Sequence, residues 1–411
     1  SDVCSSDLIK SRARVRTLRT LSLAQVFSGI GVAGAVPAGA LLVFDVSGNE
    51  SLSGLAQTFS VFGAALMAIP LASLTARGGR RLALSVGYLM GALGATFAVI
   101  GGSLNFLPIL LLGTMLAGTA SAAGYQTRFA AVDLSDDDHR ARDLSIVVWA
   151  GTIGSVVGPN LLDFSGSIAH KFGLKELVGP YLFAGTMLII GAVTVFALLR
   201  PDPYLLSRSE LGHVIKKRER GSTKMAFGLI RKSPDASLAL AAIVIGHITM
   251  VSIMVMTPVH MRHVEVSLKV IGLVISVHIL GMYLFAPVMG SLSDRLGRRA
   301  VIRLGVLILF LSAIISGRSA ADDAISLGLG LFLLGLGWSA TIVAGSTLLS
   351  ESIDIEHRPA VQGASDLMMN GAGAIGGAGA GVIIAVASYG WLCGLSLIPV
   401  AALGAMAFKN R

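Results

Sequence analysis

Long apolar runs separated by short polar segments dominate the chain. Most runs have about 20 residues, the length that an α-helix needs to cross the hydrocarbon core of a bilayer. The pattern therefore predicts an all-α polytopic membrane protein with twelve transmembrane helices. The predicted spans are residues 20–44, 52–75, 82–102, 107–131, 143–164, 178–199, 236–260, 267–289, 300–317, 324–349, 360–385 and 388–408.

The composition agrees with a membrane protein. Hydrophobic residues make up 54% of the 411 residues and charged residues only 13%, whereas soluble domains carry about 25% charged residues. The 50 glycines also fit, because glycine is more frequent in membrane helices than in soluble ones. With two cysteines and no CxxC pair, the chain has neither a disulfide framework nor a thiolate metal site.

The positive charges predict the orientation in the membrane. Lysine and arginine cluster at residues 10–19, before the first span, and in alternate connections further along the chain. The positive-inside rule places these segments in the cytoplasm. An even number of spans then puts both termini on the cytoplasmic side of the plasma (inner) membrane. The net charge of +9 reflects this topology, so no nucleic-acid partner is expected.

One long polar connection divides the spans into two groups of six. It contains the basic stretch HVIKKRERGSTK, which could also touch anionic lipid headgroups. The predicted organisation is a cytoplasmic tail (1–19), a six-helix bundle (20–199), a cytoplasmic linker (200–235) and a second six-helix bundle (236–411).

The two bundles carry an internal repeat. Residues 71–81 align without gaps with residues 289–299, an offset of 218 residues, and six of the eleven positions are identical. The same offset places His139-Arg140 on His357-Arg358. A parallel duplication of a six-helix unit predicts a substrate site near the bilayer midplane, between the halves.

The second copy of this repeat, GSLSDRLGRR (290–299), resembles the GxxxDRxGRR signature of the major facilitator superfamily. The resemblance implies a secondary transporter that works by alternating access. Asp294 can face the amino-terminal dipole of a neighbouring helix, and the resemblance implies that this helix is the span 360–385. Arg295 and Arg298 would belong to the same gate. The first copy has Ala76 where the aspartate belongs, so we predict the stronger latch in the second half.

The stretch GSVVGP (154–159) resembles the GxxxGP core of the antiporter motif in that superfamily. Gly154 and Gly158 would allow another helix to approach closely, and Pro159 would kink its own helix. Simple helix packing is an equally good interpretation, so antiport stays open.

Histidine and methionine concentrate in residues 247–289, which hold four of the eight histidines and six of the fourteen methionines. Met250 and Met254 are four residues apart and share a helix face, as do His278 and Met282. Thioether sulfur and imidazole together suit copper, especially Cu(I). Further candidate ligands on the seventh span are His247, Met256 and His260.

The stretches MVSIM (250–254) and HILGM (278–282) resemble the paired MxxxM and HxxxM signatures of the CcoA-like copper importers, a branch of that superfamily. The resemblance implies Met250, Met254, His278 and Met282 as transient ligands. Copper would be a transported substrate, and no permanently bound cofactor is expected. The wider CcoA-like group also includes riboflavin carriers. A packing role for the methionines and an organic substrate therefore remain alternatives.

Two charged residues lie inside predicted spans, where charges are usually paired or face water. Arg128 lies near the cytoplasmic end of span 107–131, and Asp366 lies one or two turns into span 360–385. They could form a gate with each other or with separate partners. Asp366 is the first candidate for proton coupling and Asp45 the second. A static ion pair that braces two helices is the alternative.

The sequence contains no Walker, nucleophile-elbow, zinc-protease or dinucleotide-binding pattern in a suitable context, so an enzyme is not expected. Copper uptake is the first hypothesis. The second is a proton-coupled transporter of small organic molecules, either a riboflavin-like substrate or a drug for efflux. A membrane receptor or sensor is third, because no appended soluble domain is visible. We expect a monomer whose partners are the transported species and the lipid bilayer.

Overall fold

The computed structural model describes residues 2–49, 52, 54–210, 223–262, 266 and 268–409, and no β-strand occurs within these ranges. Ten helical segments of this part are long and apolar enough to cross a membrane. The middle of the predicted linker, residues 211–222, lies outside the described residues. The chain forms two compact units, here called unit 1 and unit 2. The all-helical prediction is confirmed.

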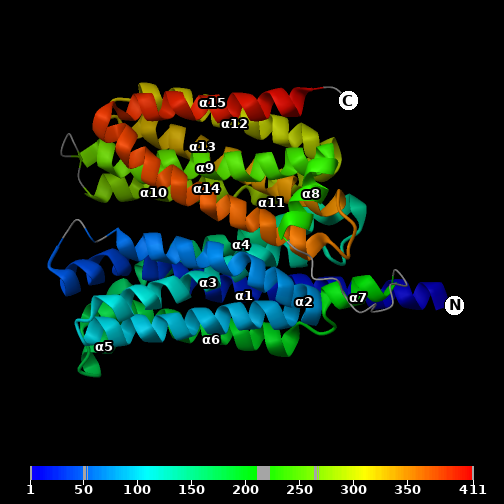
Figure 1. The fold of residues 1–411 in the computed structure, drawn as a ribbon, viewed down its shortest axis with the longest axis horizontal. Helices are drawn as coiled ribbons and strands as arrows, with labels where there is room; N and C mark the ends of the chain where they lie inside the picture. The colour runs from blue at the N-terminus through cyan, green and yellow to red at the C-terminus, as the bar shows by residue number, and fades with distance from the viewer. Residues whose placement is uncertain are drawn as a thin grey trace. The chain divides into compact units, whose positions relative to one another are not determined.

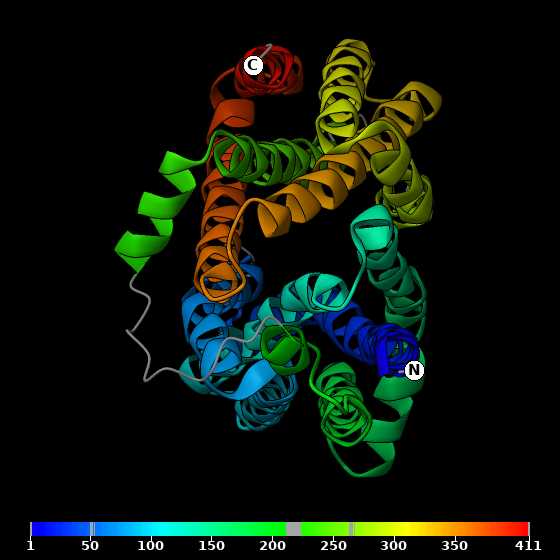
Figure 2. The ribbon, with the colours of Figure 1, turned by 90° about the vertical axis from the view of Figure 1, so that its right-hand side faces the viewer.

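Unit 1 comprises Ser1–Ser135, Ala150–Ala226 and Asp354–Asn370. Its long helices run side by side in Figure 1 and are seen end-on in Figure 2. They are α1 (Asp2–Ser47), α2 (Leu55–Ser103), α3 (Leu107–Val132) and α6 (Gly179–Leu198). Shorter elements are α5 (Leu162–Lys171), η3 (Glu176–Val178) and α7 (Pro203–Glu210).

Unit 2 comprises Asp136–Trp149, Phe227–Ile353 and Gly371–Arg411. The helix α13 is its centre, because α9, α10, α11 and α12 all pack against it. Its elements are η2 (Asp137–His139), α9 (Pro234–Arg262), α10 (Leu268–Tyr283), α11 (Ala286–Leu296), α12 (Arg298–Arg318), α13 (Ala324–Glu351) and α15 (Tyr389–Phe408). The boundary between the units falls within α8 (Thr223–Lys232), at residues 226 and 227.

Two helices contribute residues to both units. The first turns of α4 (Arg140–Asn160) belong to unit 2, and its remainder belongs to unit 1. Conversely, α14 (Arg358–Val386) begins in unit 1 and continues in unit 2 from Gly371. Each unit therefore contains the start of a helix whose remaining residues belong to the other.

The predicted spans 52–75 and 82–102 both fall within α2, which is 49 residues long. Gly79 interrupts its helical geometry with φ 83° and ψ 176°. A positive φ of this kind favours glycine, which has no Cβ. The helix restarts at once, and the backbone N–H of Arg81 donates to Asp202 Oδ2 at 2.7 Å. The turn at Gly79 therefore divides α2 into two helical parts, which correspond to the two predicted spans.

The predicted span 267–289 is divided into α10 and α11. Pro287 lies in the first turn of α11, and proline cannot donate a backbone hydrogen bond to an earlier turn. The break at Leu284 and Phe285 follows from this missing donor. The predicted span 143–164 falls on α4 and α5 and is not among the ten apolar segments.

Glycine lets α2 and α3 touch through their backbones. An added Cβ on Gly63 would overlap the carbonyl oxygen of Met115, and one on Gly118 would overlap that of Ser60. Small residues at such crossings permit the close packing that drives helix association in membranes. Part of the high glycine content therefore serves the packing of unit 1.

We expect Gly118→Ala to lower the free energy of unfolding by about 1–3 kcal/mol, because the methyl group has no space at this crossing. Thermal unfolding of the purified protein in detergent measures the change. Gly272→Ala in α10 is the matched control, since an added Cβ there meets no atom within 4 Å. Equal destabilisation by both variants would contradict the packing argument.

Candidate functional site

His278 lies near the middle of the candidate span Val270–Leu296 and is fully buried. Its Nδ1 atom is 2.8 Å from the carbonyl oxygen of Leu331 in α13. Because a carbonyl oxygen can only accept, Nδ1 carries the proton and donates it. In the neutral ring Nε2 then bears a lone pair, and this buried atom has no hydrogen-bond partner among the described residues. This is the orientation usual for a metal-binding histidine.

Met282 is one turn further along the same face of α10 and is also buried. Both residues lie where α10 presses on α13. An added Cβ on Gly335 would overlap the carbonyl oxygen of His278 and would lie 2.7 Å from the backbone nitrogen of Met282. The predicted pair His278 and Met282 is therefore held at the α10–α13 contact.

The second predicted pair lies on α9. Met250 is buried, Met254 is half-buried, and His247 lies on the same helix face. The indole Nε1 of Trp338 donates a hydrogen bond to Nδ1 of His247 at 3.2 Å. The neutral His247 ring therefore carries its proton on Nε2. In this arrangement neither nitrogen of His247 offers a lone pair to a metal ion, in contrast to His278.

Trp338 of α13 contacts one residue near each pair. Its ring contacts His247 of α9 and lies edge-on to Tyr283 of α10, with 5.8 Å between the Tyr283 and Trp338 ring centroids. Tyr283 follows Met282 and is the last residue of α10 before the break to α11. Interrupted helices near the midplane are typical of substrate sites in secondary transporters. The centre of unit 2 is thus the strongest candidate for a substrate site.

The outer candidates have a different neighbour. The ring of His260 stacks on Tyr389 of α15, with centroids 4.4 Å apart and an interplanar angle of 11°. The hydroxyl groups of Thr257 and Tyr389 are 2.8 Å apart. Met256 is half-buried on the adjacent turn of α9. The structure therefore places His260 at the α9–α15 contact and not with the α10 pair.

Acidic side chains do not supplement this site. No group of three or more His, Cys, Asp or Glu residues in the described part of the chain could hold a metal ion. If Met282 served as a further ligand beside His278, its thioether sulfur would select soft ions over hard ones.

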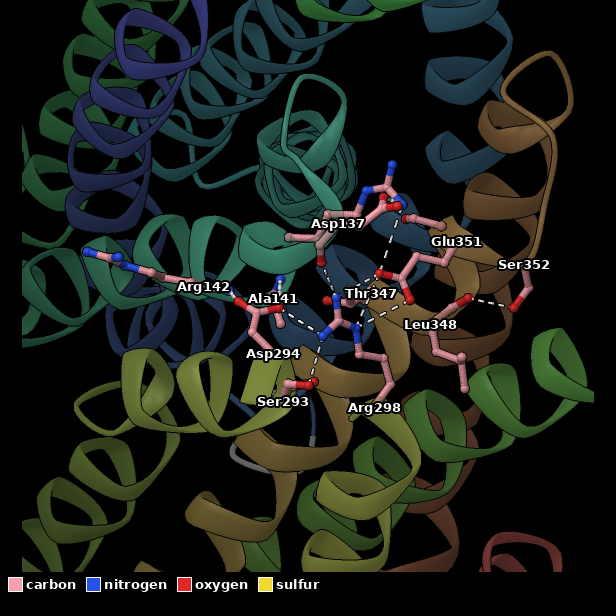
Figure 3. Close-up of polar contacts among 12 residues, drawn as sticks. Asp137, Ala141, Arg142, Ser293, Asp294, Arg298, Thr347, Leu348, Glu351 and Ser352 are labelled. Atoms are coloured by element: carbon pink, nitrogen blue, oxygen red, sulfur yellow. Dashed lines mark hydrogen bonds and ion pairs between the residues drawn. The ribbon is translucent and has the colours of Figure 1, made fainter. Parts of the chain in front are cut away.

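Asp294 lies at the amino terminus of α4, as Figure 3 shows. Its Oδ1 accepts the backbone N–H of Ala141 at 3.1 Å, and its Oδ2 accepts that of Arg142 at 2.9 Å. A carboxylate there satisfies free N–H groups and faces the positive end of the helix dipole. The prediction that the span 360–385 supplies this terminus is wrong, because the backbone N–H groups that Asp294 accepts belong to α4.

Arg298 completes the contact around Asp294 (Figure 3). Its guanidinium lies 2.9 Å from Asp294 Oδ1 and 2.8 Å from Glu351 Oε1, and it donates to the carbonyl oxygen of Asp137 at 2.7 Å. Arg295 points to the surface. We call the set Asp294, Arg298 and Glu351, together with the first turn of α4, the unit 2 latch.

Unit 1 contains a comparable contact with the first turns of α14. Arg80 binds both oxygens of Asp133, at 2.8 and 3.3 Å, and donates to Gln362 of α14 at 2.7 Å. One turn further along α14, Asp366 Oδ1 is 2.6 Å from Nη2 of Arg128. We call these five residues the unit 1 latch. Arg128 and Asp366 pair with each other, which is one of the two arrangements that the sequence left open, and both side chains are buried.

The predicted kink motif lies where α4 crosses α1. An added Cβ on Gly154 would lie 2.6 Å from the Cα of Gly29, and one on Gly158 would lie 2.8 Å from the backbone nitrogen of Gly34. These contacts show close helix packing within unit 1. The helix α4 continues through Pro159 and ends at Asn160.

The sequence matches the family model of the Major Facilitator Superfamily over residues 21–265 and 238–411. The chain belongs to this superfamily. It is 35% identical over 400 residues to the uncharacterized MFS-type transporter YdeG of Bacillus subtilis (strain 168), covering 94% of this chain and 91% of that protein. It is 27% identical over 378 residues to the riboflavin transporter RfnT of Brucella anthropi, covering 92% and 90%. The chain is thus a transporter and not an enzyme.

Solved structures share the Major Facilitator Superfamily fold. A bacterial homologue of the iron transporter ferroportin, in an outward-facing state, superposes with a TM-score of 0.74 at 15% identity, covering 96% of this chain and 98% of that chain. The proton:xylose symporter XylE superposes with a TM-score of 0.72 at 13% identity, covering 97% and 95%. Identities this low support the fold alone.

The superfamily repeat explains residues that sequence reasoning missed. The offset of 218 places Arg80 on Arg298 and Asp133 on Glu351, and these residues form corresponding ion pairs in the two latches of the transporter. The offset relates the two ion pairs residue by residue, but the sequence alone does not show that either pair forms. Gln362 has no such signal, because the offset places it on Leu144.

We expect Asp294→Ala to lower the free energy of unfolding by about 1–2 kcal/mol, because the first turn of α4 loses its capping carboxylate. Thermal unfolding in detergent provides the measurement. Asp137→Ala is the matched control: its side chain is 83% exposed, so the loss should stay below about 0.5 kcal/mol. Similar losses in both variants would show that the cap is not stabilising.

Proposed function

We propose that this transporter moves copper ions by alternating access, with Met250, Met254, His278 and Met282 as transient ligands. This would place it in the CcoA-like branch of its superfamily. The single observation that carries the proposal is the state of His278. Leu331 fixes its Nδ1–H, and its buried Nε2 points away from any hydrogen-bond partner among the described residues.

The ligand chemistry suits a transported ion. Thioether and neutral imidazole groups bind soft cations without adding charge to a membrane span, where charge is costly. A site with few neutral ligands can also release its ion. Since α9 and α10 both pack against α13, copper would pass between the two pairs by exchanging one ligand at a time.

We further propose twelve spans with both termini in the cytoplasm. The segment α2 would supply two spans on either side of Gly79, and α4 with α5 would supply the span that is not among the ten apolar segments. The transporter would function as a monomer in the plasma (inner) membrane, with six-helix halves at 20–199 and 236–411.

A second candidate is the transport of a small aromatic molecule such as riboflavin. Two observations favour it: the 27% identity to the riboflavin transporter RfnT, and the aromatic rings beside the candidate site. Besides Tyr283 and Trp338, Phe285 and Phe332 lie edge-on with centroids 5.6 Å apart. Aromatic faces of this kind can stack on a flat organic ring.

We expect the double variant Met250→Leu/Met254→Leu to lower copper-64 uptake into cells by roughly tenfold or more, because leucine fills the same volume without a sulfur ligand. Membrane levels of the variants are matched to wild type. Met261→Leu on the same helix is the control, since this buried methionine is not part of either pair.

If well-expressed wild type takes up no copper, the copper proposal is wrong. The same cells are therefore also tested with radiolabelled riboflavin. Uptake of riboflavin that survives the double methionine variant would establish the second candidate, because an organic carrier tolerates Met→Leu.

His278→Asn separates ligation from folding. The asparagine amide can replace Nδ1–H as donor to the Leu331 carbonyl, but it leaves nothing at the position of Nε2. We expect an unchanged thermal midpoint in detergent and a loss of copper uptake of roughly tenfold or more. Full uptake by this variant would show that Nε2 is not a ligand.

A further inference from the structure

Asp366 differs from the other carboxylates of the two latches in one respect. Its Oδ1 is 2.6 Å from Arg128, but its Oδ2 is buried and has no hydrogen-bond partner among the described residues. Both oxygens of Asp294 are occupied by backbone N–H groups, and both oxygens of Asp133 are bound by Arg80. A buried acceptor left open in this way is rare.

The surroundings of Asp366 contain few charged groups. From α3, Arg128 forms the ion pair and Tyr125 lies near the Arg128 guanidinium, 5.8 Å from its ring centroid to Cζ. From α2, Arg80 also acts on Asp366 electrostatically, although Asp133 and Gln362 hold its guanidinium. On α14 itself, Met369 places its sulfur 3.7 Å from Nη1 of Arg128.

The ion pair holds the first turns of α14 in unit 1. The neighbouring contacts are neutral on the α14 side: Gln362 accepts from Arg80, and Gly363 packs against Ala72 of α2. Asp366 is thus the charged anchor of this helix segment among these contacts. The unit 2 latch has a carboxylate at a helix terminus instead, and its oxygens are saturated.

We propose that Asp366 is a proton-binding site whose protonation releases the first turns of α14 from α2 and α3. A proton from water forms an O–H bond at Oδ2, and the carboxylate loses its charge. Arg128 keeps its own charge, because guanidinium stays protonated at all accessible pH values. The ion pair is then lost, and a buried cation without its partner is strongly unfavourable. The released segment lets water reach Arg128.

The population of the released state depends on pH. At high pH the carboxylate is charged, the pair is intact and α14 is docked. At low pH the pair is broken and the released state gains population. This inference goes beyond copper transport, since it concerns the proton and applies to any substrate of the transporter.

A cysteine reporter tests the proposal without any substrate. Ser365→Cys introduces a thiol at a fully buried position beside Asp366, in a chain whose two native cysteines are changed to serine. The labelling rate by N-ethylmaleimide is measured in purified full-length protein from pH 5 to pH 8, spanning roughly the range in which a buried carboxyl titrates. The same reporter with Asp366→Asn is measured in parallel, and the ratio of the two rates cancels the pH dependence of the thiol.

At pH 8 we expect the Asp366→Asn reporter to react about tenfold faster than the reporter alone. The free energy lost when a buried ion pair is broken is larger than the free energy that shifts a population tenfold. The ratio should approach one as the pH falls. A ratio that stays constant over the range would overturn the proposal, as would equal rates at pH 8.

Two further variants keep the test decisive. The double variant Arg128→Gln/Asp366→Asn removes both charges. It replaces Asp366→Asn as the reference if Asp366→Asn misfolds. The ratio of its labelling rate to that of the reporter alone should then show the same pH dependence. Asp45→Asn is the matched control, because Asp45 is exposed and bonded to Lys175 at 2.6 Å. The reporter with Asp45→Asn should keep the pH dependence of the labelling rate that the reporter alone shows. Loss of this pH dependence would assign the proton-binding site to Asp45 instead.

Discussion

The structure depends on how helices associate in a bilayer, where packing gains no hydrophobic stabilisation because lipid is as apolar as the side chains. Association must then come from close backbone contact and from a few polar interactions. The glycine contacts between α2 and α3 and between α1 and α4 supply the first. Hydrogen bonds and ion pairs inside the protein supply the second. Buried charged side chains are therefore few among the described residues, and each of them needs a structural or functional reason.

Two places hold the polar contacts that bear most on function. One is the centre of unit 2, where His278, Trp338 and His247 link three helices by hydrogen bonds to neutral groups. The other is the pair of latches, where arginines and carboxylates hold the starts of α4 and α14. In the proposed mechanism, substrate binding and conformational control would be carried by different residues: neutral ligands in one place and ion pairs in the other.

The sequence predicted the all-helical fold and showed the repeat and the two charges inside spans, Arg128 and Asp366, because span length, charge bias and charged residues are local signals. It left open whether Arg128 and Asp366 pair with each other. It did not predict which helix Asp294 caps, since that depends on tertiary packing. It also missed the break between α10 and α11, although Pro287 was a visible signal. The tautomers of His247 and His278 depend on Trp338 and Leu331 in another helix, so no pattern within α9 or α10 could distinguish a ligand from a hydrogen-bonded histidine.

Duplication explains why the latches are similar, and divergence explains why they differ. The pairs Arg80–Asp133 and Arg298–Glu351 occupy corresponding positions and brace each repeat. Where the second repeat has Asp294, the first has Ala76 and relies on Asp366 of α14 instead. The carboxylate of Asp294 at the helix terminus accepts a backbone N–H group at each oxygen. A buried carboxylate with one open oxygen can gain or lose a proton. Two copies of one architecture can therefore give a stable contact in one unit and a switchable one in the other, which a transporter needs to alternate between states.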